Sequence, residues 1–350
     1  MKRICLVCFV SFLIISCKSD KLLIKNPRFS SVKIDTLLTE KMSSRALLID
    51  NDKLWYAANN GKYGFVSLID SIRLHAAVTK ENLKLEFRSI GQTKQSIFIL
   101  CVANPALLYK IDKVTKQLAL VYEEKNEKVF YDSMLFMNEK EGIAIGDPTL
   151  DCPSIITTED GGSTWKKRSC SGLPKFEDGE AFFAASNTNI RYKNNTLFMV
   201  SGGKKSRVYV STDKGITWNT YETPMVQGQA MTGAFCADFY DENIGIIAGG
   251  NYEKPLQNFQ NKATTKDGGR SWQLIADHSA FGYASCIQFV PNSGGKSILE
   301  VGANGIFYSR NSGKKWIQLA TDTDLITFRF IDSKTAVASG KNRIVKLSLK

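Results

Sequence analysis

The stretch Thr158-Glu159-Asp160-Gly161-Gly162-Ser163-Thr164-Trp165 returns three more times, in variant form, along this chain of 350 residues. The other copies end in Trp218, Trp272 and Trp316, and their acidic positions hold Asp213, Asp267 and, in the last copy, Asn311. An Asp at this position accepts hydrogen bonds from amides of its own turn, Gly adopts a positive φ, and Trp packs onto the neighbouring strand. We therefore predict that each octet forms a structural β-hairpin turn.

Strand-like runs recur around the octets with a period of about 45 residues. Each candidate inner strand is followed by a polar turn and by a second apolar run that ends in small residues. The candidates are 45–48, 87–90, 132–136, 182–186, 235–239, 285–290 and 326–331. Short, evenly spaced strands without an amphipathic helix predict an all-β fold, a seven-bladed β-propeller over residues 31–350. We expect the segment 31–38 to close it by supplying the outer strand that the last blade lacks.

The octets resemble the Asp-box (BNR) repeat of β-propellers. Further resemblance lies in the Arg-Ala-Leu and Arg-Ser-Ile strand starts at 45 and 88, and in the Gly-Ile-Ala-Ile-Gly and Gly-Ile-Ile-Ala-Gly-Gly runs at 142 and 245. Together they make the chain similar to the photosystem II assembly and stability factor family, and more closely to lipoproteins of that superfamily from non-photosynthetic bacteria. The resemblance implies a non-enzymatic assembly factor, with Asp-boxes on the face away from the ligand site. Nothing in the sequence indicates a photosystem.

Residues 1–16 have the pattern of a secretory signal, with a basic start and an apolar run over 4–15. The end of this segment, Ile14-Ile15-Ser16-Cys17, resembles the bacterial lipobox and predicts cleavage before Cys17 and lipidation of its sulfur. The alternative is an ordinary signal with a chance cysteine. Residues 17–30 would then be the lipidated Cys and a tether that anchors the protein in the cell envelope. Lys18, in place of Asp, favours the outer membrane.

The chain is basic, with 46 Lys and Arg against 34 Asp and Glu and a formal net charge of +12. The positive charges are dispersed, and no RNA-binding or zinc-finger signature is present, so we expect no nucleic-acid partner and a soluble monomer. There are only 2 His, no Gly-x-Gly-x-x-Gly after a strand and no haem motif. We therefore predict neither a cofactor nor a metal.

Cysteine positions suggest one covalent link. Cys152 and Cys170 lie at equal distances from the centre of the first octet, so they would face each other across its hairpin. We predict a disulfide between them, and the alternative is two free thiols. Cys101, Cys236 and Cys286 fall within predicted strands and are expected to be buried as small apolar side chains.

Candidate binding residues lie on the face opposite the octets. If the octets join the third and fourth strands, the opposite face receives the starts of the inner strands and the loops between the second and third strands. Arginines placed there can bind carboxylates through paired hydrogen bonds, or can form ion pairs that stabilise the channel mouth. The candidates are Arg45, Arg88, Asp132, Glu180 and Arg329 from strands, with Asp147, Lys204, Lys205, Arg207 and Tyr252 from loops.

These features favour a protein-binding or assembly platform without catalytic residues, whose partner is an envelope or membrane protein with an acidic segment. One alternative is a sialidase-like glycoside hydrolase, which would use Arg45, Arg88, Tyr131, Asp132 and Glu180. The Arg-Ile-Pro element expected near the first sialidase Arg is absent, because Ser44-Arg45-Ala46 stands there. The other alternative is a propeller that binds glycans without catalysis.

Overall fold

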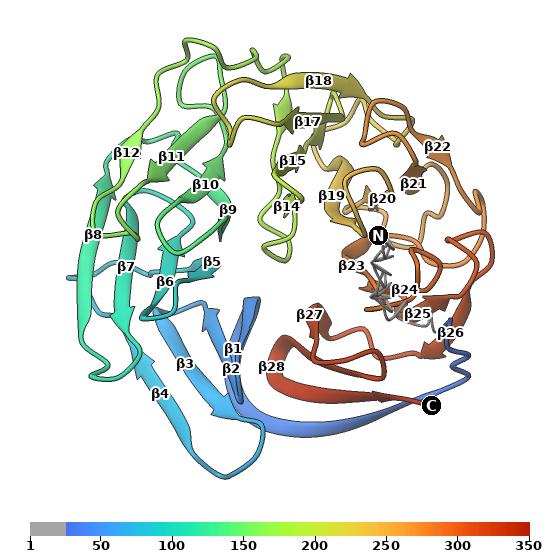
Figure 1. Ribbon diagram of the computed structural model, residues 1–350, viewed down its shortest axis with the longest axis horizontal. Helices are drawn as coiled ribbons and strands as arrows, with labels where there is room; N and C mark the ends of the chain where they lie inside the picture. Colours follow the sequence, from blue (N-terminus) through green and yellow to red (C-terminus); the bar gives the residue numbers. More distant parts are fainter. Residues whose placement is uncertain (1–25) are drawn as a thin grey trace, which may run out of the picture.

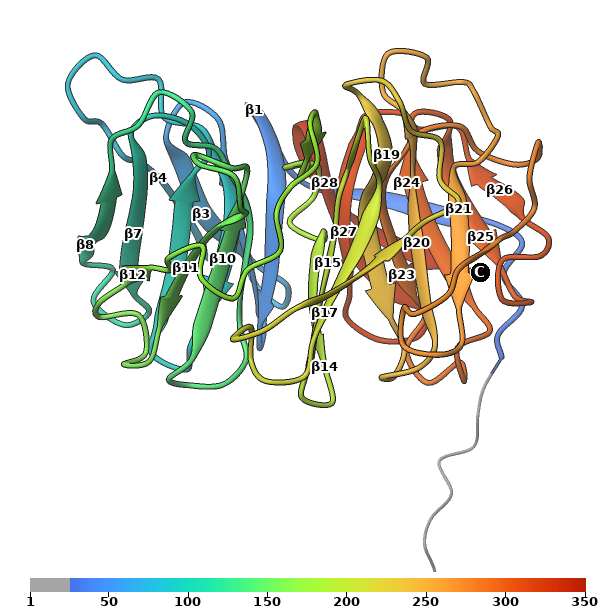
Figure 2. The ribbon, with the colours of Figure 1, turned by 90° about the horizontal axis from the view of Figure 1, so that it is seen from above.

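The computed structural model describes residues 26–350, which form β-sheets arranged in a ring (Figure 1). Strands within each sheet are antiparallel, and in the four-stranded sheets they follow one another in chain order. Seen from the side, the sheets stand next to one another in a single layer (Figure 2). The all-β propeller architecture expected from the sequence is therefore present. The predicted signal at 1–16 and Cys17 lie outside the described residues.

Four sheets contain four strands each. From the inner to the outer strand, they are β5 (Phe87–Gln92), β6 (Ser96–Cys101), β7 (Ala106–Asp112) and β8 (Leu118–Glu124); β9 (Tyr131–Phe136), β10 (Gly142–Gly146), β11 (Ser154–Thr158) and β12 (Lys166–Lys167); β14 (Ile190–Lys193), β15 (Thr196–Val200), β17 (Arg207–Ser211) and β18 (Asn219–Glu222); and β23 (Ala284–Phe289), β24 (Ile298–Gly302), β25 (Gly305–Ser309) and β26 (Ile317–Ala320).

Two further sheets contain six strands each. In hydrogen-bonded order, the first consists of β27 (Leu325–Phe330), β28 (Thr335–Leu349), β1 (Val32–Asp50), β2 (Lys53–Ala58), β3 (Lys62–Ser67) and β4 (Arg73–Ala77). The second consists of β13 (Glu180–Ala181), β16 (Gly202–Gly203), β19 (Thr232–Phe239), β20 (Gly245–Asn251), β21 (Lys262–Thr265) and β22 (Gln273–Leu274).

The prediction of seven blades is wrong, because the strands form six sheets. The cause is the length of β1, a strand of 19 residues. Its first part pairs with β28, from Val32 opposite Leu349 to Ser43 opposite Lys341, and its last part pairs with β2. The first and last repeat units of the sequence therefore share one continuous sheet instead of forming two separate ones.

The two ends of the described chain meet in this sheet. Figure 1 shows β1 in blue beside β28 in red, and Lys350 donates its N–H to the carbonyl of Ser31 at 3.0 Å. The N-terminal segment thus removes a free edge from the last repeat unit, which would otherwise expose unpaired backbone groups.

One predicted inner strand is absent. Residues 182–186 form no strand, and β14 (Ile190–Lys193) takes the innermost place in its sheet. The segment before β14 instead directs its polar groups to other inner strands across the axis of the ring. Because of those hydrogen bonds, residues 182–185 do not form a strand, although their apolar side chains favour one.

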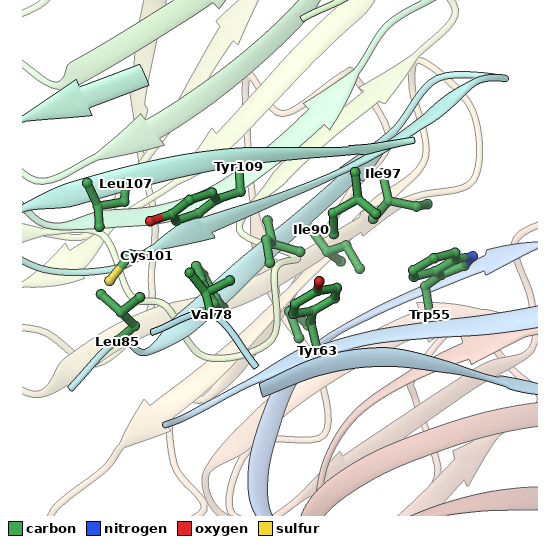
Figure 3. Packing of buried hydrophobic residues seen from close by; sticks show 14 of the residues in the cluster. Trp55, Tyr63, Val78, Leu85, Ile90, Ile97, Cys101, Leu107 and Tyr109 are labelled. Carbon is green, nitrogen blue, oxygen red and sulfur yellow. The ribbon is translucent and has the colours of Figure 1, made fainter. Parts of the chain in front are cut away.

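Apolar side chains between neighbouring sheets form the core. In the cluster of Figure 3, Trp55 and Tyr63 belong to strands β2 and β3, and Ile97 and Tyr109 belong to β6 and β7 of the next sheet. Full burial of a large apolar side chain contributes roughly 1.5–3 kcal/mol, so contacts of this kind hold adjacent sheets together.

The octets form compact turns. Asp160 Oδ1 accepts the N–H groups of Ser163 and Thr164 at 2.9 Å each, and Asp160 Oδ2 accepts the Thr164 hydroxyl at 2.6 Å. Gly162 has a φ of 78°, which favours glycine at this position. Trp165 is buried beside the hairpin. The same Asp contacts recur at Asp213 and Asp267, whereas Asn311 accepts one backbone amide, from Lys315 at 2.9 Å.

A disulfide joins Cys152 and Cys170, whose Cα atoms are 5.6 Å apart across the first octet hairpin. The three other described cysteines, Cys101, Cys236 and Cys286, are free thiols inside the protein.

Candidate functional site

The two faces of the ring carry opposite ends of the inner strands. The turn after β9 lies beside the first octet, because Gly161 donates its N–H to the Lys140 carbonyl at 2.9 Å. The face on which inner strands end is therefore the octet face. The face on which they begin is called the start face below.

Residues 182–189, called the axial segment below, cross the ring between these faces. The Asn187 amide donates to the carbonyl of Ile90 in β5, and its oxygen accepts the N–H of Met134 in β9, each at 2.9 Å. Asn187 has a φ of 55°, a conformation that Asn tolerates better than most residues. Its side chain therefore pairs with one backbone group of β5 and one of β9, as a neighbouring strand would.

The axial segment also reaches the inner strands on the other side of the ring. The Ser186 hydroxyl donates to the Ser285 carbonyl in β23 at 2.6 Å, and the Ser186 carbonyl accepts the Thr327 hydroxyl in β27 at 3.1 Å. The Thr188 carbonyl accepts the N–H of Ala237 in β19 at 3.0 Å. Because its residues from Ala184 onward are buried, the segment separates a cavity on the start face from one on the octet face.

The start-face cavity has a volume of about 240 Å³ and combines arginine with aromatic side chains. The rings of Phe183 and Phe235 stack with their centroids 3.8 Å apart, and Tyr283 meets Phe235 edge-on at 4.8 Å. Tyr252 stands at the rim, 45% exposed, with its ring 5.2 Å from that of Tyr283. The lining consists of Arg45, Arg88, Phe183, Ala184, Ala185, Met231, Phe235, Tyr252 and Tyr283.

Both arginines keep hydrogen-bond donors available. Arg45, near the bend of β1, is half-buried, and its Nε has no partner among the described residues. Arg88 donates from Nε to Glu86 Oε1 at 2.8 Å, and that bond lies at the partly exposed edge of the cavity. A guanidinium with free donors can hold a carboxylate through two parallel hydrogen bonds.

Asp132 lies close to Arg88, and Asp147 lies close to Asp132. Asp132 is fully buried, and neither carboxyl oxygen has a hydrogen-bond partner among residues 26–350. Burial raises the pKa of Asp132 well above its usual range, and the charge of Asp147 adds to this, whereas Arg88 opposes it. Burial also raises the pKa of Asp147 to about 7, although its Oδ1 accepts the Phe182 N–H at 2.7 Å. A raised pKa favours the neutral form of Asp132, so this carboxyl competes less with an external anion for Arg88.

The structure brings part of the predicted set together. Arg45, Arg88 and Tyr252 line one cavity, Asp132 lies close to Arg88, and Asp147 lies close to Asp132. The remaining five candidates lie elsewhere: Glu180, Lys204, Lys205, Arg207 and Arg329 do not line this cavity.

Glu180 and Arg207 neutralise each other in the interior. Arg207 Nε lies 3.1 Å from each carboxylate oxygen of Glu180, and the Tyr209 hydroxyl donates to Glu180 Oε1 at 2.6 Å. Their partners are already in place, so this pair stabilises the sheet and offers no free charge.

Lys204 and Lys205 lie at a separate hollow of about 520 Å³ that is strongly polar. Lys204 Nζ is 3.1 Å from Asp178, and Lys205 Nζ is 2.5 Å from Glu222. Each lysine is thus paired with an exposed carboxylate, an arrangement typical of a solvated surface.

Arg329 lies toward the octet face. It lines a second axial cavity of about 440 Å³, on the far side of the axial segment from Arg45. Arg329 comes about three residues later in its inner strand than Arg45 and Arg88 do in theirs. Because each inner strand runs from the start face to the octet face, Arg329 lies nearer the octet face.

The aromatic residues of the start-face cavity were missed. Phe183 and Phe235 fall within the predicted inner strands at 182–186 and 235–239, and Tyr283 lies just before the one at 285–290, and none of the three was named as a candidate binding residue. Their offsets from the starts of those strands differ, because Phe183 is the second residue of its strand, Phe235 is the first, and Tyr283 comes two residues earlier. The sequence therefore offered no repeated aromatic position from which a shared cavity could be predicted.

The residues proposed for a glycosidase do not converge. The Tyr131 hydroxyl donates to Glu124 Oε2 at 2.8 Å, on the outer strand β8 of the preceding sheet. Glu180 is engaged by Arg207, and Asp132 is buried without a partner. Tyr131, Asp132 and Glu180 therefore do not form an acid and nucleophile pair beside Arg45 and Arg88.

Within the described residues, one group of three metal-ligating side chains comes together, formed by Asp151, Cys152 and Cys170. Its two sulfur atoms are joined as a disulfide, so no thiolate is present to bind a metal. In the part of the chain that the structure describes, no helix has the length and apolar character needed to cross a bilayer.

No family model and no curated protein matches this chain. Solved propellers do resemble it: the structure described as "YCF48 bound to D1 peptide" has a TM-score of 0.65 at 10% identity and covers 93% of this chain and 98% of its own. YCF48 from Cyanidioschyzon merolae has a TM-score of 0.63 at 12% identity, with coverage of 91% and 98%. The WD40 repeats of RRP9 give 0.63 at 10% identity, with coverage of 92% and 100%. At these identities the likeness shows a β-propeller fold.

Proposed function

We propose that this chain is a non-enzymatic protein-binding propeller, and that its start-face cavity holds an acidic segment of the partner. The observation that carries the proposal is the meeting of Arg45 and Arg88, with free donors, and four aromatic rings in one cavity. Guanidinium groups bind a carboxylate, while the rings bury the apolar part of a neighbouring side chain. Arginine and aromatic residues also dominate the binding energy of protein interfaces.

The fold supports the same function. One structural neighbour, YCF48, is described as bound to the D1 peptide, and others are WD40 propellers. A propeller axis provides a rigid frame on which side chains from several sheets converge. A peptide bound there would lose little affinity to reordering of the receptor, because the axial segment already fixes the cavity floor.

We further propose that the chain belongs to the lipoprotein branch of the Asp-box propellers and acts in the cell envelope. The four octets and the Ile14-Ile15-Ser16-Cys17 sequence support this. The test is expression of the full chain and of Cys17→Ala in a bacterial host. Lipidation predicts that the native chain sediments with membranes and carries acyl mass, and that Cys17→Ala does neither. Equal sedimentation of both would contradict it.

Peptide binding can be measured directly. Fluorescently labelled peptides that combine Asp or Glu with an aromatic residue are titrated with the purified full chain, and matched peptides carry Lys in place of the acids. Arg45→Gln/Arg88→Gln should weaken binding of the acidic peptides at least tenfold, since charge-assisted hydrogen bonds are lost. Arg73→Gln/Arg270→Gln makes the same charge change at exposed positions away from the cavity and should leave binding unchanged.

The natural partner is sought by affinity capture from gently solubilised membranes with the same two double variants. An envelope protein retained by Arg73→Gln/Arg270→Gln and lost with Arg45→Gln/Arg88→Gln supports the proposal. Partners indifferent to both variants, or turnover of a fluorogenic sialoside that depends on Arg45 and Arg88, would contradict it.

A further inference from the structure

The octet-face cavity is a funnel with apolar walls. It has a volume of about 440 Å³, within the range of sites for small organic ligands. The ends of inner strands from several sheets supply its lining, including Leu48 of β1, Leu135 of β9, Phe289 of β23 and Phe330 of β27. The floor is the axial segment, through Asn187.

Two arginines lie in this apolar lining. Arg191 donates from Nε to the Ala237 carbonyl at 2.8 Å and lies 3.3 Å from Asp238 Oδ1. Its Nη2 is buried and has no hydrogen-bond partner among the described residues. Buried donors are almost always paired in folded proteins, so this nitrogen indicates a missing acceptor.

Arg329 supplies the second cation. Its Nη2 donates to the Ser186 carbonyl at 3.1 Å, and its Nη1 donates to the Phe328 carbonyl at 2.6 Å, which orients the side chain. Burial lowers its pKa to about 10, and the charge of Arg191 adds to this, whereas Cys286 and Asp238 oppose it. It remains charged at neutral pH.

The local charges do not balance. Asp238 is the carboxylate beside the two guanidinium groups, and its Oδ2 already accepts the Phe289 N–H at 2.7 Å. Two cations therefore share one carboxylate at the base of an apolar funnel. A second anion would complete the site.

We propose that this cavity binds an amphipathic carboxylate, with its head group between Arg191 and Arg329 and an unbranched apolar tail along the funnel wall. The arginines can hold the head by charge-assisted hydrogen bonds. The tail would cover side chains such as Leu48, Leu135 and Phe330, which the protein leaves partly exposed. A site with one polar end and an apolar remainder matches a fatty-acid-like molecule.

The other polar groups of the funnel favour this ligand over a peptide. Gln92 donates to the Ile49 carbonyl at 3.2 Å, Gln288 donates to the Phe328 carbonyl at 3.0 Å, and Asn187 is bound on both sides. A peptide brings several backbone groups that need partners, and these side chains are already engaged. A ligand with a single polar head has no such need.

This site is independent of the start-face cavity, because the axial segment lies between them. Titration calorimetry of the purified full chain with dodecanoate, below its micelle concentration, tests it. Dodecanol has the same tail without the charge, and acetate has the head without the tail. We expect saturable binding of dodecanoate, and binding at least tenfold weaker for the other two.

Variants assign the two parts of the ligand. Arg329→Gln should weaken dodecanoate at least tenfold and change dodecanol less than twofold, whereas Arg329→Lys should restore part of the loss. Leu135→Trp, which fills the funnel, should weaken both. Arg45→Gln/Arg88→Gln, on the other face, should change neither. Thermal melts verify that each variant is folded. If Arg329→Gln does not fold, Leu135→Trp tests the proposal in its place.

Three results would overturn the proposal. They are equal affinity for dodecanoate and dodecanol, binding of dodecanoate that survives both Arg329→Gln and Leu135→Trp, and tighter binding of a short peptide with a free apolar C-terminus than of dodecanoate. The last result would assign the site to a chain terminus instead.

Discussion

Glu180 and Arg207 form an ion pair in the interior of the propeller, with the Glu180 side chain fully buried and the Arg207 side chain 10% exposed. Tyr209 donates to the same carboxylate, and Glu177 donates its N–H to Glu180 Oε2 at 3.0 Å. All these partners satisfy the two charges within the protein. The pair therefore belongs to the scaffold and not to a ligand site.

Removing one member of this pair should be costly. We expect Glu180→Gln to lower the free energy of unfolding by roughly 3–5 kcal/mol, because a buried guanidinium loses its counter-charge. Urea denaturation measures this change. Lys33→Gln, which breaks the exposed ion pair with Asp35, should change stability by less than about 1 kcal/mol. Weaker peptide binding by folded Glu180→Gln, without a loss of stability, would contradict the structural role.

Asp147 should make stability depend on pH near neutrality. Its pKa is raised from 3.8 to about 7, so the folded state holds the proton more tightly than the unfolded chain. Its contribution is fully present below pH 4 and is lost as the pH rises through about 7. Asp147→Asn cannot ionise and still offers an acceptor to Phe182. Melting curves between pH 4 and pH 8 should be flatter for Asp147→Asn than for the native protein.

The exposed Asp151 provides the control for this prediction. Asp151→Asn makes the same change of charge at a side chain that is 61% exposed, and should leave the pH profile unaltered. A native profile that is flat over the same range would show that Asp147 titrates normally.

The octet aspartates should make the protein less stable at low pH, which is the opposite of the effect of Asp147. The Thr164 hydroxyl, with further hydrogen bonds, lowers the pKa of Asp160 to about 2. Its contribution is present above pH 4 and is lost as the pH falls toward 2. We expect Asp160→Ala to lower stability at pH 7 by roughly 1–2 kcal/mol, since the turn loses several hydrogen bonds but is open to solvent. Urea denaturation at pH 7 and pH 2.5 measures both effects.

Asn311 indicates that Asn in place of the octet Asp should destabilise the turn less than Ala does. Its amide oxygen still accepts the Lys315 N–H at 2.9 Å, so Asp160→Asn should retain part of the turn and lose less stability than Asp160→Ala. Equal losses in the two variants would mean that the backbone amides of the turn contribute little.

Asn187 should be essential for the axial segment. Asn187→Ala leaves the Ile90 carbonyl and the Met134 N–H unpaired inside the protein and places Ala at a positive φ. We expect a loss of roughly 2–5 kcal/mol in urea denaturation. Asn187→Asp keeps the acceptor for Met134 but buries a carboxylate against the Ile90 carbonyl, so it should also be destabilising. A change below about 0.5 kcal/mol for Asn187→Ala would show that the segment is not held by this side chain.

Local patterns predicted the parts of the fold that depend on local chemistry. The octet at 158–165 forms its turn because the hydrogen bonds made by its Thr158 and Asp160 side chains join residues at most four positions apart. Arg45, Arg88 and Tyr252 share a face because strand starts and adjoining loops lie together in any propeller. Such relations follow from the repeat and need no knowledge of distant contacts.

Long-range contacts decided the rest. Residues 182–186 have the apolar character of a strand, but hydrogen bonds to five other sheets draw residues 186–188 across the axis. The number of sheets depends on how far β1 pairs with β28, at the opposite end of the chain. Glu180 and Arg207 form their ion pair although they lie 27 residues apart in the sequence. Residue spacing within one repeat could not predict this contact.

The pairing of β1 with β28 sets the order in which the chain can fold. Val32 cannot pair with Leu349 until residues 335–349 have been synthesised, so the ring stays open until then. During that time the first half of β1 is an unpaired edge that other chains can occupy. Contacts so distant along the chain also make the final step slow. Pairing of β1 with β28 thus ends the period in which this edge is most exposed to aggregation.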